Sequence, residues 1–259
     1  MEITLPIIEL TLPMFLIVCP LVFLAGLVDA IGGGGGLISL PAYLFAGVPM
    51  HQAIATNKLS SAVGTVVSTV RLCRNTKIEW ALALPSIVLS LIGSFIGAKL
   101  TLLVSEHILK IVLLIVLPVV AVFVFRKNSL VEKQSGTVSH RRMMVISWLS
   151  AFVIGGYDGF YGPGTGTFLI LLMVGCAKMD MMQAAANTKL INLASNLSAL
   201  VTFLISGKVV MALGLAAAVF SVAGHYVGST LVMKNGAKVV KPIILVVLAL
   251  LFVKIITEL

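Results

Sequence analysis

One pattern occurs twice in this chain, and it limits the possible folds more than any other sequence feature. In each copy an aspartate precedes a glycine cluster, and a lysine next to an Asn/Thr pair follows further along. The first copy contains Asp29, the glycines of 32–36 and Lys58, and the second contains Asp158, the glycine-rich segment 162–166 and Lys189. The aspartates lie 129 positions apart and the lysines 131, a difference that a loop can absorb. Apolar segments interrupted by glycine at corresponding places in two halves are the best sequence indication of a transporter's binding site.

The composition identifies the surroundings of most side chains. Hydrophobic residues make up 59% of the sequence and charged residues only 10%, whereas a soluble domain has about 25% charged residues. We therefore expect an all-α, polytopic membrane protein in which most side chains face lipid or other apolar helices. The three cysteines, Cys19, Cys73 and Cys176, have no paired spacing, so neither a disulfide framework nor a metal site is predicted.

Apolar runs and the residues that interrupt them divide the chain into ten segments. These are 6–31, 35–48, 51–74, 79–103, 107–126, 142–160, 165–177, 181–205, 209–233 and 238–257. Most contain the roughly 20 apolar residues that a bilayer crossing requires. The segments 35–48 and 165–177 are too short and follow the glycine clusters, so we interpret each as the returning arm of a hairpin that dips into the membrane. Irregular backbone at that depth is tolerated only inside protein or beside a water-filled cavity.

The distribution of basic residues predicts the orientation of these segments. If the hydrophilic link between the halves, 126–142, is cytoplasmic, twelve of the eighteen lysines and arginines lie on the cytoplasmic side and four on the opposite side. This is a clear positive-inside bias, and it places both termini outside. Each half has an odd number of segments, so the second half is inverted relative to the first.

We therefore predict one transmembrane bundle built from two inverted repeats. The first repeat is 1–126, the cytoplasmic linker is 127–141 and the second repeat is 142–259. Each repeat is expected to contain a glycine-broken, re-entrant-like helix hairpin and three membrane-spanning helices. The formal charge of +9 follows mostly from this topology and does not indicate a nucleic-acid partner.

The glycine clusters are candidates for anion binding. Each glycine costs a helix about 1 kcal/mol relative to alanine, but it permits a tight turn and a close approach of backbone to ligand. A short helix is expected directly after each cluster, and its first N–H groups and positive dipole end attract anions. The alternative is that the glycines only let helices pack closely. Because the cluster occurs in both copies we favour binding, and the candidate residues are Gly33, Gly34, Gly35, Gly36, Gly164, Thr165 and Gly166.

Lys58 and Lys189 are ionisable residues within apolar segments, which makes them candidates for a functional site. The alternative is that each lysine snorkels, because it lies about 10 Å from a helix end and its stem can reach the interface. Their polar neighbours favour a cavity, since a polar stripe on an apolar helix should face the bundle interior. These neighbours are Thr56, Asn57, Ser61, Thr65 and Ser68 in one segment, and Asn187, Thr188, Asn192, Ser195 and Asn196 in the other. We expect the stripe to attract an anion.

Asp29 and Asp158 have several possible roles in this arrangement. Either could carry a coupling proton, accept hydrogen bonds from the broken turn, or pair with one of the two lysines. We favour a structural role, since an anion pathway has little use for two ionised carboxylates at its centre. His225 is interpreted as a packed interior residue. No metal ligands, cofactor site or repeated catalytic grouping is found, so an enzyme is not expected.

The repeated motifs resemble those of the TauE/SafE sulfite-exporter family. The sequence Gly-x-x-Asp-Ala-Ile-Gly-Gly-Gly-Gly-Gly-Leu-Ile, followed by Ala-Thr-Asn-Lys-Leu, is similar to that family's first repeat, and Ala-Asn-Thr-Lys-Leu-Ile-Asn is similar to its second. The resemblance covers nearly the whole chain, although Pro163 interrupts the second glycine cluster. It implies a transporter for a small sulfur-containing anion, such as sulfite, thiosulfate, sulfoacetate or another organosulfonate. The implied location is a bacterial inner membrane or its archaeal equivalent.

We therefore predict a secondary transporter that exports this anion by alternating access at a site near the membrane midplane. The binding groups would be the candidate residues of the glycine clusters together with Thr56, Asn57, Lys58, Asn187, Thr188, Lys189 and Asn192. An anion channel with the same site and a proton-coupled uptake permease are the alternatives. The expected partners are the anion and the lipid bilayer, and the oligomeric state does not follow from the sequence.

Overall fold

The computed structural model describes residues 9–132 and 138–232. Within these ranges the chain forms helices and no strand, so the all-α prediction is confirmed. The helices are α1 (Leu12–Gly32), α2 (Gly36–Phe45), α3 (Met50–Asn75), α4 (Trp80–Leu103), α5 (Glu106–Glu132), α6 (His140–Phe160), α7 (Thr165–Gly175), α8 (Met181–Ile205) and α9 (Met211–Val232). The tenth predicted segment, 238–257, lies outside the described residues.

Five of the described helices, α1, α4, α6, α8 and α9, are long and apolar enough to cross a membrane. Large apolar side chains stand on their outer faces, including Leu84 on α4 and Leu149 on α6. Such an exposed surface is stable in hydrocarbon but would aggregate in water. These helices confirm the prediction of a multi-pass membrane protein.

Helix α3 has 26 residues, but it is too polar to be counted among the helices that could cross a membrane by their apolar composition. Its buried side chains include Gln52, Asn57, Lys58, Ser60 and Thr65, which are all polar. The sequence analysis counted 51–74 among the apolar segments and predicted that its polar stripe faces the bundle interior, and the buried polar face of α3 agrees with this stripe. Buried polar groups are stable only when they are hydrogen-bonded, so the neighbours of α3 must supply partners.

The two predicted short segments form short helices. Helix α2 has 10 residues and α7 has 11, so each is about 15 Å long, half the thickness of a bilayer core. Helix α1 leads into α2 through glycines at positive φ, with Gly33 at +73° and Gly34 at +109°. The turn from α6 into α7 uses Gly162 at +102° and Gly164 at +85°. Only glycine adopts these conformations at little cost, so the glycine clusters are what allow the chain to reverse here.

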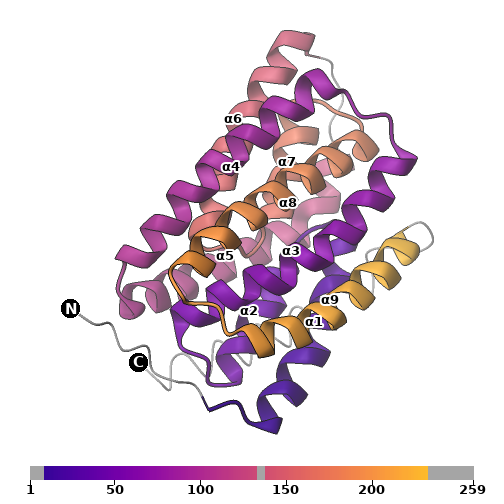
Figure 1. The fold of residues 1–259 in the computed structure, drawn as a ribbon. Helices are drawn as coiled ribbons and strands as arrows, with labels where there is room; N and C mark the ends of the chain where they lie inside the picture. Colours follow the sequence, from indigo (N-terminus) through magenta and orange to yellow (C-terminus); the bar gives the residue numbers. More distant parts are fainter. Residues whose placement is uncertain (1–8, 133–137, 233–259) are drawn as a thin grey trace.

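The helices pack in two lateral pairs around a central pair. Helix α4 packs along α6 and α1 packs along α9, while α3 and α8 lie between these pairs and contact each other (Figure 1). Glycines make the lateral contacts close, because a Cβ at Gly97 would collide with the carbonyl oxygen of Gly156, and a Cβ at Gly228 would lie 2.5 Å from that of Leu27. Close approach through small residues is the usual packing mode of membrane helices.

Candidate functional site

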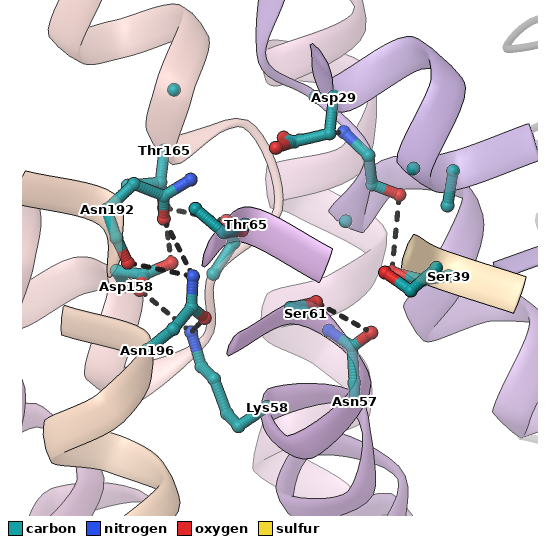
Figure 2. A pocket seen from close by; sticks show the side chains of 18 of the residues that line it. Asp29, Ser39, Asn57, Lys58, Ser61, Thr65, Asp158, Thr165, Asn192 and Asn196 are labelled. Atoms are coloured by element: carbon teal, nitrogen blue, oxygen red, sulfur yellow. Dashed lines mark hydrogen bonds and ion pairs between the residues drawn. The ribbon is translucent and has the colours of Figure 1, made fainter. Parts of the chain in front are cut away.

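A cavity lies where the two glycine turns meet α3, α8 and α9 (Figure 2). Together with the solvent at its open side, it comprises about 490 Å³ that no protein atom fills. The lining is mainly polar or glycine: Gly26, Asp29, Gly34, Gly35, Gly36, Ser39, Asn57, Lys58, Ser61, Thr65, Asp158, Gly162, Gly164, Thr165, Gly166, Asn192, Asn196, Ser221 and His225, with Val22 and Ala25. A polar cavity inside an apolar bundle indicates a site for a polar ligand.

The two glycine turns touch each other beside this cavity. A Cβ on Gly166 would lie 2.8 Å from Cα of Gly33, and a Cβ on Gly36 would lie 2.9 Å from Cα of Pro163. The cap residues of α2 and α7 are Gly35 and Gly164, and neither helix has a side-chain cap. The N-terminal ends of both short helices therefore present backbone amides and positive dipole ends near the same cavity.

Lys58 on α3 forms an ion pair with Asp158 on α6, with Nζ 2.9 Å from Oδ2, and both side chains are almost completely buried. The amine also donates to Oδ1 of Asn196 at 3.1 Å. The carboxylate accepts from Thr165 Oγ1 at 2.8 Å and from Ser195 Oγ at 2.6 Å. Charge and hydrogen-bonding capacity are thus well satisfied, as the burial of an ion pair requires.

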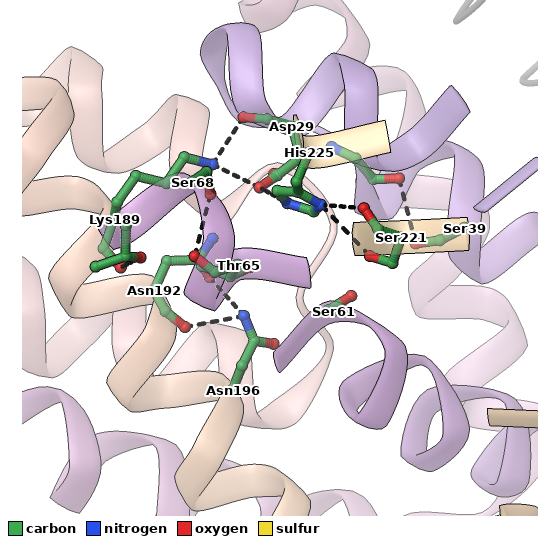
Figure 3. A network of polar contacts seen from close by, with 12 residues as sticks. Asp29, Ser39, Ser61, Thr65, Ser68, Lys189, Asn192, Asn196, Ser221 and His225 are labelled. Atoms are coloured by element: carbon green, nitrogen blue, oxygen red, sulfur yellow. Dashed lines mark hydrogen bonds and ion pairs between the residues drawn. The ribbon is translucent and has the colours of Figure 1, made fainter. Parts of the chain in front are cut away.

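Lys189 on α8 forms the corresponding pair with Asp29 on α1. Its amine donates to the carboxylate Oδ2 at 2.6 Å and to the backbone carbonyl of the same residue at 2.7 Å. Asp29 Oδ2 also lies 3.2 Å from Nε2 of His225 on α9, and Oδ1 accepts from the amide of Gly35 at 3.4 Å (Figure 3). The side chain of Asp29 is 13% exposed, compared with 3% for Asp158, so this second pair is the more accessible one.

Both ion pairs cross between the halves of the chain. The lysine of the first half binds the aspartate of the second, and the lysine of the second half binds the aspartate of the first. Among the roles left open for the aspartates, the structure contains pairing with the two lysines and, for Asp29, a hydrogen bond from the Gly35 amide in the glycine turn. The pairs also tie each glycine turn to the lysine-bearing helix of the other half.

Most of the predicted binding residues line this cavity. They are Gly34, Gly35, Gly36, Asn57, Lys58, Gly164, Thr165, Gly166 and Asn192, together with the aspartates Asp29 and Asp158. Five predicted residues are not in its lining: Gly33, Thr56, Asn187, Thr188 and Lys189. Lys189 still reaches the site through its contact with Asp29.

The other residues outside the lining have neighbours that explain their place. Gly33 lies against the backbone of Gly166. Thr56 accepts a hydrogen bond from the amide of Val210 at 3.0 Å, and Thr188 contacts the sulfur of Met173 at 3.7 Å. Asn187 donates to the carbonyl of Gln183 at 2.9 Å. The alternation of helical faces separates these side chains from Asn57 and Asn192.

The sequence analysis missed His225 and Ser221 as cavity residues. His225 is buried and was expected to be only a packed interior side chain, whereas it contacts Asp29 and borders the cavity. At the repeat offset of 131 positions, His225 corresponds to Ser94 and Gly64 corresponds to Ser195. This difference between the two halves is the sequence signal that could have identified His225. In the described part of the chain, no three His, Cys, Asp or Glu side chains form a group that could hold a metal ion.

Comparison with known proteins places this architecture in a family. Residues 18–255 match the family model described as "Sulfite exporter TauE/SafE". The chain is 34% identical over 238 residues to a "Probable membrane transporter protein ORF9" from Sinorhizobium sp, covering 91% of this chain and 90% of the relative. It is 32% identical over 237 residues to "Probable membrane transporter protein YfcA" from Escherichia coli (strain K12), covering 91% and 87%. No solved structure matches. The chain therefore belongs to the TauE/SafE family of membrane transport proteins.

Proposed function

We propose that this protein is a secondary transporter that moves a small sulfur-containing anion across the membrane through the cavity between the two glycine turns. The observation that carries the proposal is the meeting of two short-helix N-termini at one buried polar cavity. Backbone amides at helix N-termini bind sulfate- and phosphate-like anions without any charged side chain. Sulfite, thiosulfate, sulfoacetate and other organosulfonates all present oxygens of this kind.

The proposed binding groups have unequal roles. The amides of Gly36 and Gly166, at the positive ends of the two short helices, would hold the anionic oxygens, and Asn57 and Asn192 would donate from the side of the cavity. Lys58 borders the cavity but is already paired, so it would contribute a long-range field while Asp158 keeps it in place. A strong bond to a free lysine would also hinder release of the substrate, whereas a transporter must bind and release in each cycle.

We further propose that 1–126 and 142–259 are inverted repeats, joined by a cytoplasmic linker at 127–141. The packing supports this arrangement, because exchanging corresponding helices of the two halves converts the α4–α6 contact into the α9–α1 contact and the α3–α9 contact into the α8–α4 contact. Repeats of this kind support alternating access by rocking of one unit against the other around a midplane site. Export is the proposed direction, and a channel or a proton-coupled uptake permease is the competing function.

Transport can be tested with purified protein in liposomes loaded with sulfite, thiosulfate, sulfoacetate or methanesulfonate. We expect saturable efflux and counterflow of at least one of these anions, and no steady anion current across a planar bilayer. Conductance that does not saturate would favour the channel. Failure of every sulfur anion to move would contradict the proposed substrate class.

A matched pair of variants connects this flux to the cavity. Asn57→Ala removes a cavity amide, whereas Asn75→Ala removes one at the exposed end of the same helix. A hydrogen bond to a charged ligand contributes about 1.5–3 kcal/mol, so Asn57→Ala is expected to weaken apparent affinity by about ten- to a hundredfold. Asn75→Ala is expected to leave the affinity unchanged. Equal effects of both substitutions would place the binding site elsewhere.

The topology has its own test, at a position outside the described residues. A single cysteine at Ser135, in a background without Cys19, Cys73 and Cys176, is expected to resist an impermeant thiol reagent added to intact cells. It should react after the membrane is permeabilised, because 127–141 would be cytoplasmic. Full labelling in intact cells would reverse the proposed orientation.

A further inference from the structure

The imidazole of His225 is held between one group that can only accept a proton and one that is usually an acceptor. Its Nδ1 lies 2.9 Å from the backbone carbonyl oxygen of Ser221, and its Nε2 lies 3.2 Å from Oδ2 of Asp29 (Figure 3). The Ser221 hydroxyl oxygen also lies near Nδ1, but at 3.4 Å, and the shorter contact is with the carbonyl oxygen. A carbonyl oxygen cannot donate, so we assign a hydrogen to Nδ1. The contact with Asp29 then requires a second hydrogen, on Nε2 or on the carboxyl group.

This extra proton changes the net charge of the cluster. Asp29, Lys189 and His225 together carry one positive charge when the proton is present, whether the proton is on the imidazole or on the carboxyl group. Without the proton the cluster is neutral, and the lone pair of Nε2 faces the lone pairs of Oδ2. The Lys58–Asp158 pair is neutral in both cases and contains no group like the imidazole.

The two halves of the molecule differ at the positions that create this cluster. At the register of 131 positions, Ser94 corresponds to His225 and Ser195 corresponds to Gly64. In one half Ser195 donates to Asp158, and Ser94 donates to the carbonyl of Ser195. In the other half a Cβ at Gly64 would lie 2.6 Å from Nδ1 of His225, so glycine is what leaves room for the imidazole.

The other charged groups near α9 do not supply this proton. Helix α3 packs on α9 and contributes Lys58, which is engaged by Asp158, and Arg71. The Arg71 guanidinium donates to the carbonyl of Tyr226 and to the hydroxyl groups of Ser229 and Thr230, towards the C-terminal end of α9. Helix α1 contributes Asp29, and α8 reaches the site through Lys189. Histidine is the one residue type in this set whose side chain ordinarily gains or loses a proton near neutral pH.

We propose that His225 and Asp29 hold one transferable proton that enters and leaves the cavity with the substrate anion, so that the protein moves the two together. The cavity borders both residues, and the protonated cluster has one positive charge that an anion in the cavity would neutralise. The proton comes from water on the side where the anion enters and returns to water on the side where it leaves. This inference rests on the proposed function and names the proton as its second substrate. The gradients then set the direction: the pair leaves the cell when the outward anion gradient exceeds the inward proton gradient, and otherwise the protein works as the uptake permease named above.

Isothermal titration calorimetry with methanesulfonate, which does not itself titrate near neutral pH, measures the linkage directly. Titrations in two buffers of different ionisation enthalpy are expected to give about one proton taken up per anion bound at about pH 8. Affinity should then fall by about tenfold for each further unit of pH. Anion binding with no proton uptake and no pH dependence would contradict the inference while leaving the proposed function intact. Absence of binding by methanesulfonate and by thiosulfate would remove both.

Two variants locate the proton. His225→Asn is expected to bind the anion without proton uptake, and His107→Asn, at an exposed position, is expected to keep the wild-type linkage. The double variant Gly64→Ser with His225→Ser copies the arrangement of the other half, so it offers a packed alternative if the single variant does not fold. Proton uptake that persists in a folded variant without His225 would overturn the assignment.

Discussion

Replacing Asp158 with asparagine is expected to destabilise the protein by about 3–5 kcal/mol, the usual cost of removing one partner from a buried ion pair. Lys58 would lose its counter-ion while it is only 1% exposed, and only neutral acceptors, the oxygen of the new asparagine and the amide oxygen of Asn196, would remain near its amine. Thermal unfolding in detergent would measure the loss, with Lys99→Ala as a control at an exposed position, expected to cost at most about 1 kcal/mol.

The double variant Lys58→Met with Asp158→Asn separates the charge effect from the shape of the site. Methionine fills much of the space of the lysine stem, and the asparagine oxygen can still accept from Thr165 or Ser195. We expect this variant to recover most of the lost stability, since no buried charge remains unpaired. A double variant that is less stable than Asp158→Asn alone would show that the pair does not act as one unit.

Much of the helical framework could be predicted because lipid-facing helices need long apolar runs, and breakers between such runs are easy to find. The short helices α2 and α7 could also be predicted, since glycine clusters cut the apolar runs before them. The end of α5 could not be predicted in this way. The predicted segment ends at 126, whereas the helix continues to Glu132. Hydrophobicity indicates where lipid ends, but a helix continues into polar residues when their intrinsic propensity permits.

The pairing at the site was beyond the sequence for a different reason. The repeat identifies two aspartates and two lysines as candidates, but their spacing does not determine which aspartate forms an ion pair with which lysine. Asp29 is 160 positions from its partner Lys189 and much nearer in sequence to Lys58. The contact between α3 and α8 at the centre of the bundle belongs to the tertiary structure. It is the tertiary structure that brings Asp29 and Lys189, which are far apart in sequence, close together in space. The role of His225 was not predicted, because its imidazole fits at this position only where Gly64 has no side chain.

The contact between the two glycine turns leads to the second large expected effect. Gly33→Ala is expected to stop transport and to lower stability, because two independent penalties act at this position. The backbone has φ +73° and ψ 160°, a region that is nearly restricted to glycine and costs other residues about 1–3 kcal/mol. In addition, the new Cβ would lie 2.5 Å from the carbonyl carbon of Gly166. Relief of that overlap requires the turns to separate, and separation would pull apart the two helix N-termini that border the cavity.

Two alanine variants isolate these penalties. Gly47 has a positive φ of +82° with no atom within 4 Å of the added Cβ, so Gly47→Ala shows a backbone penalty without a collision. Gly166 is not among the glycines at positive φ, yet its Cβ would lie 2.8 Å from Cα of Gly33, so Gly166→Ala shows the collision alone. We expect Gly47→Ala to transport normally, with a small decrease in melting temperature, and Gly166→Ala to lose transport. If Gly166→Ala transported at the wild-type rate, contact between the turns would not be needed for function, and the loss in Gly33→Ala would have to come from backbone strain in the turn that leads into α2.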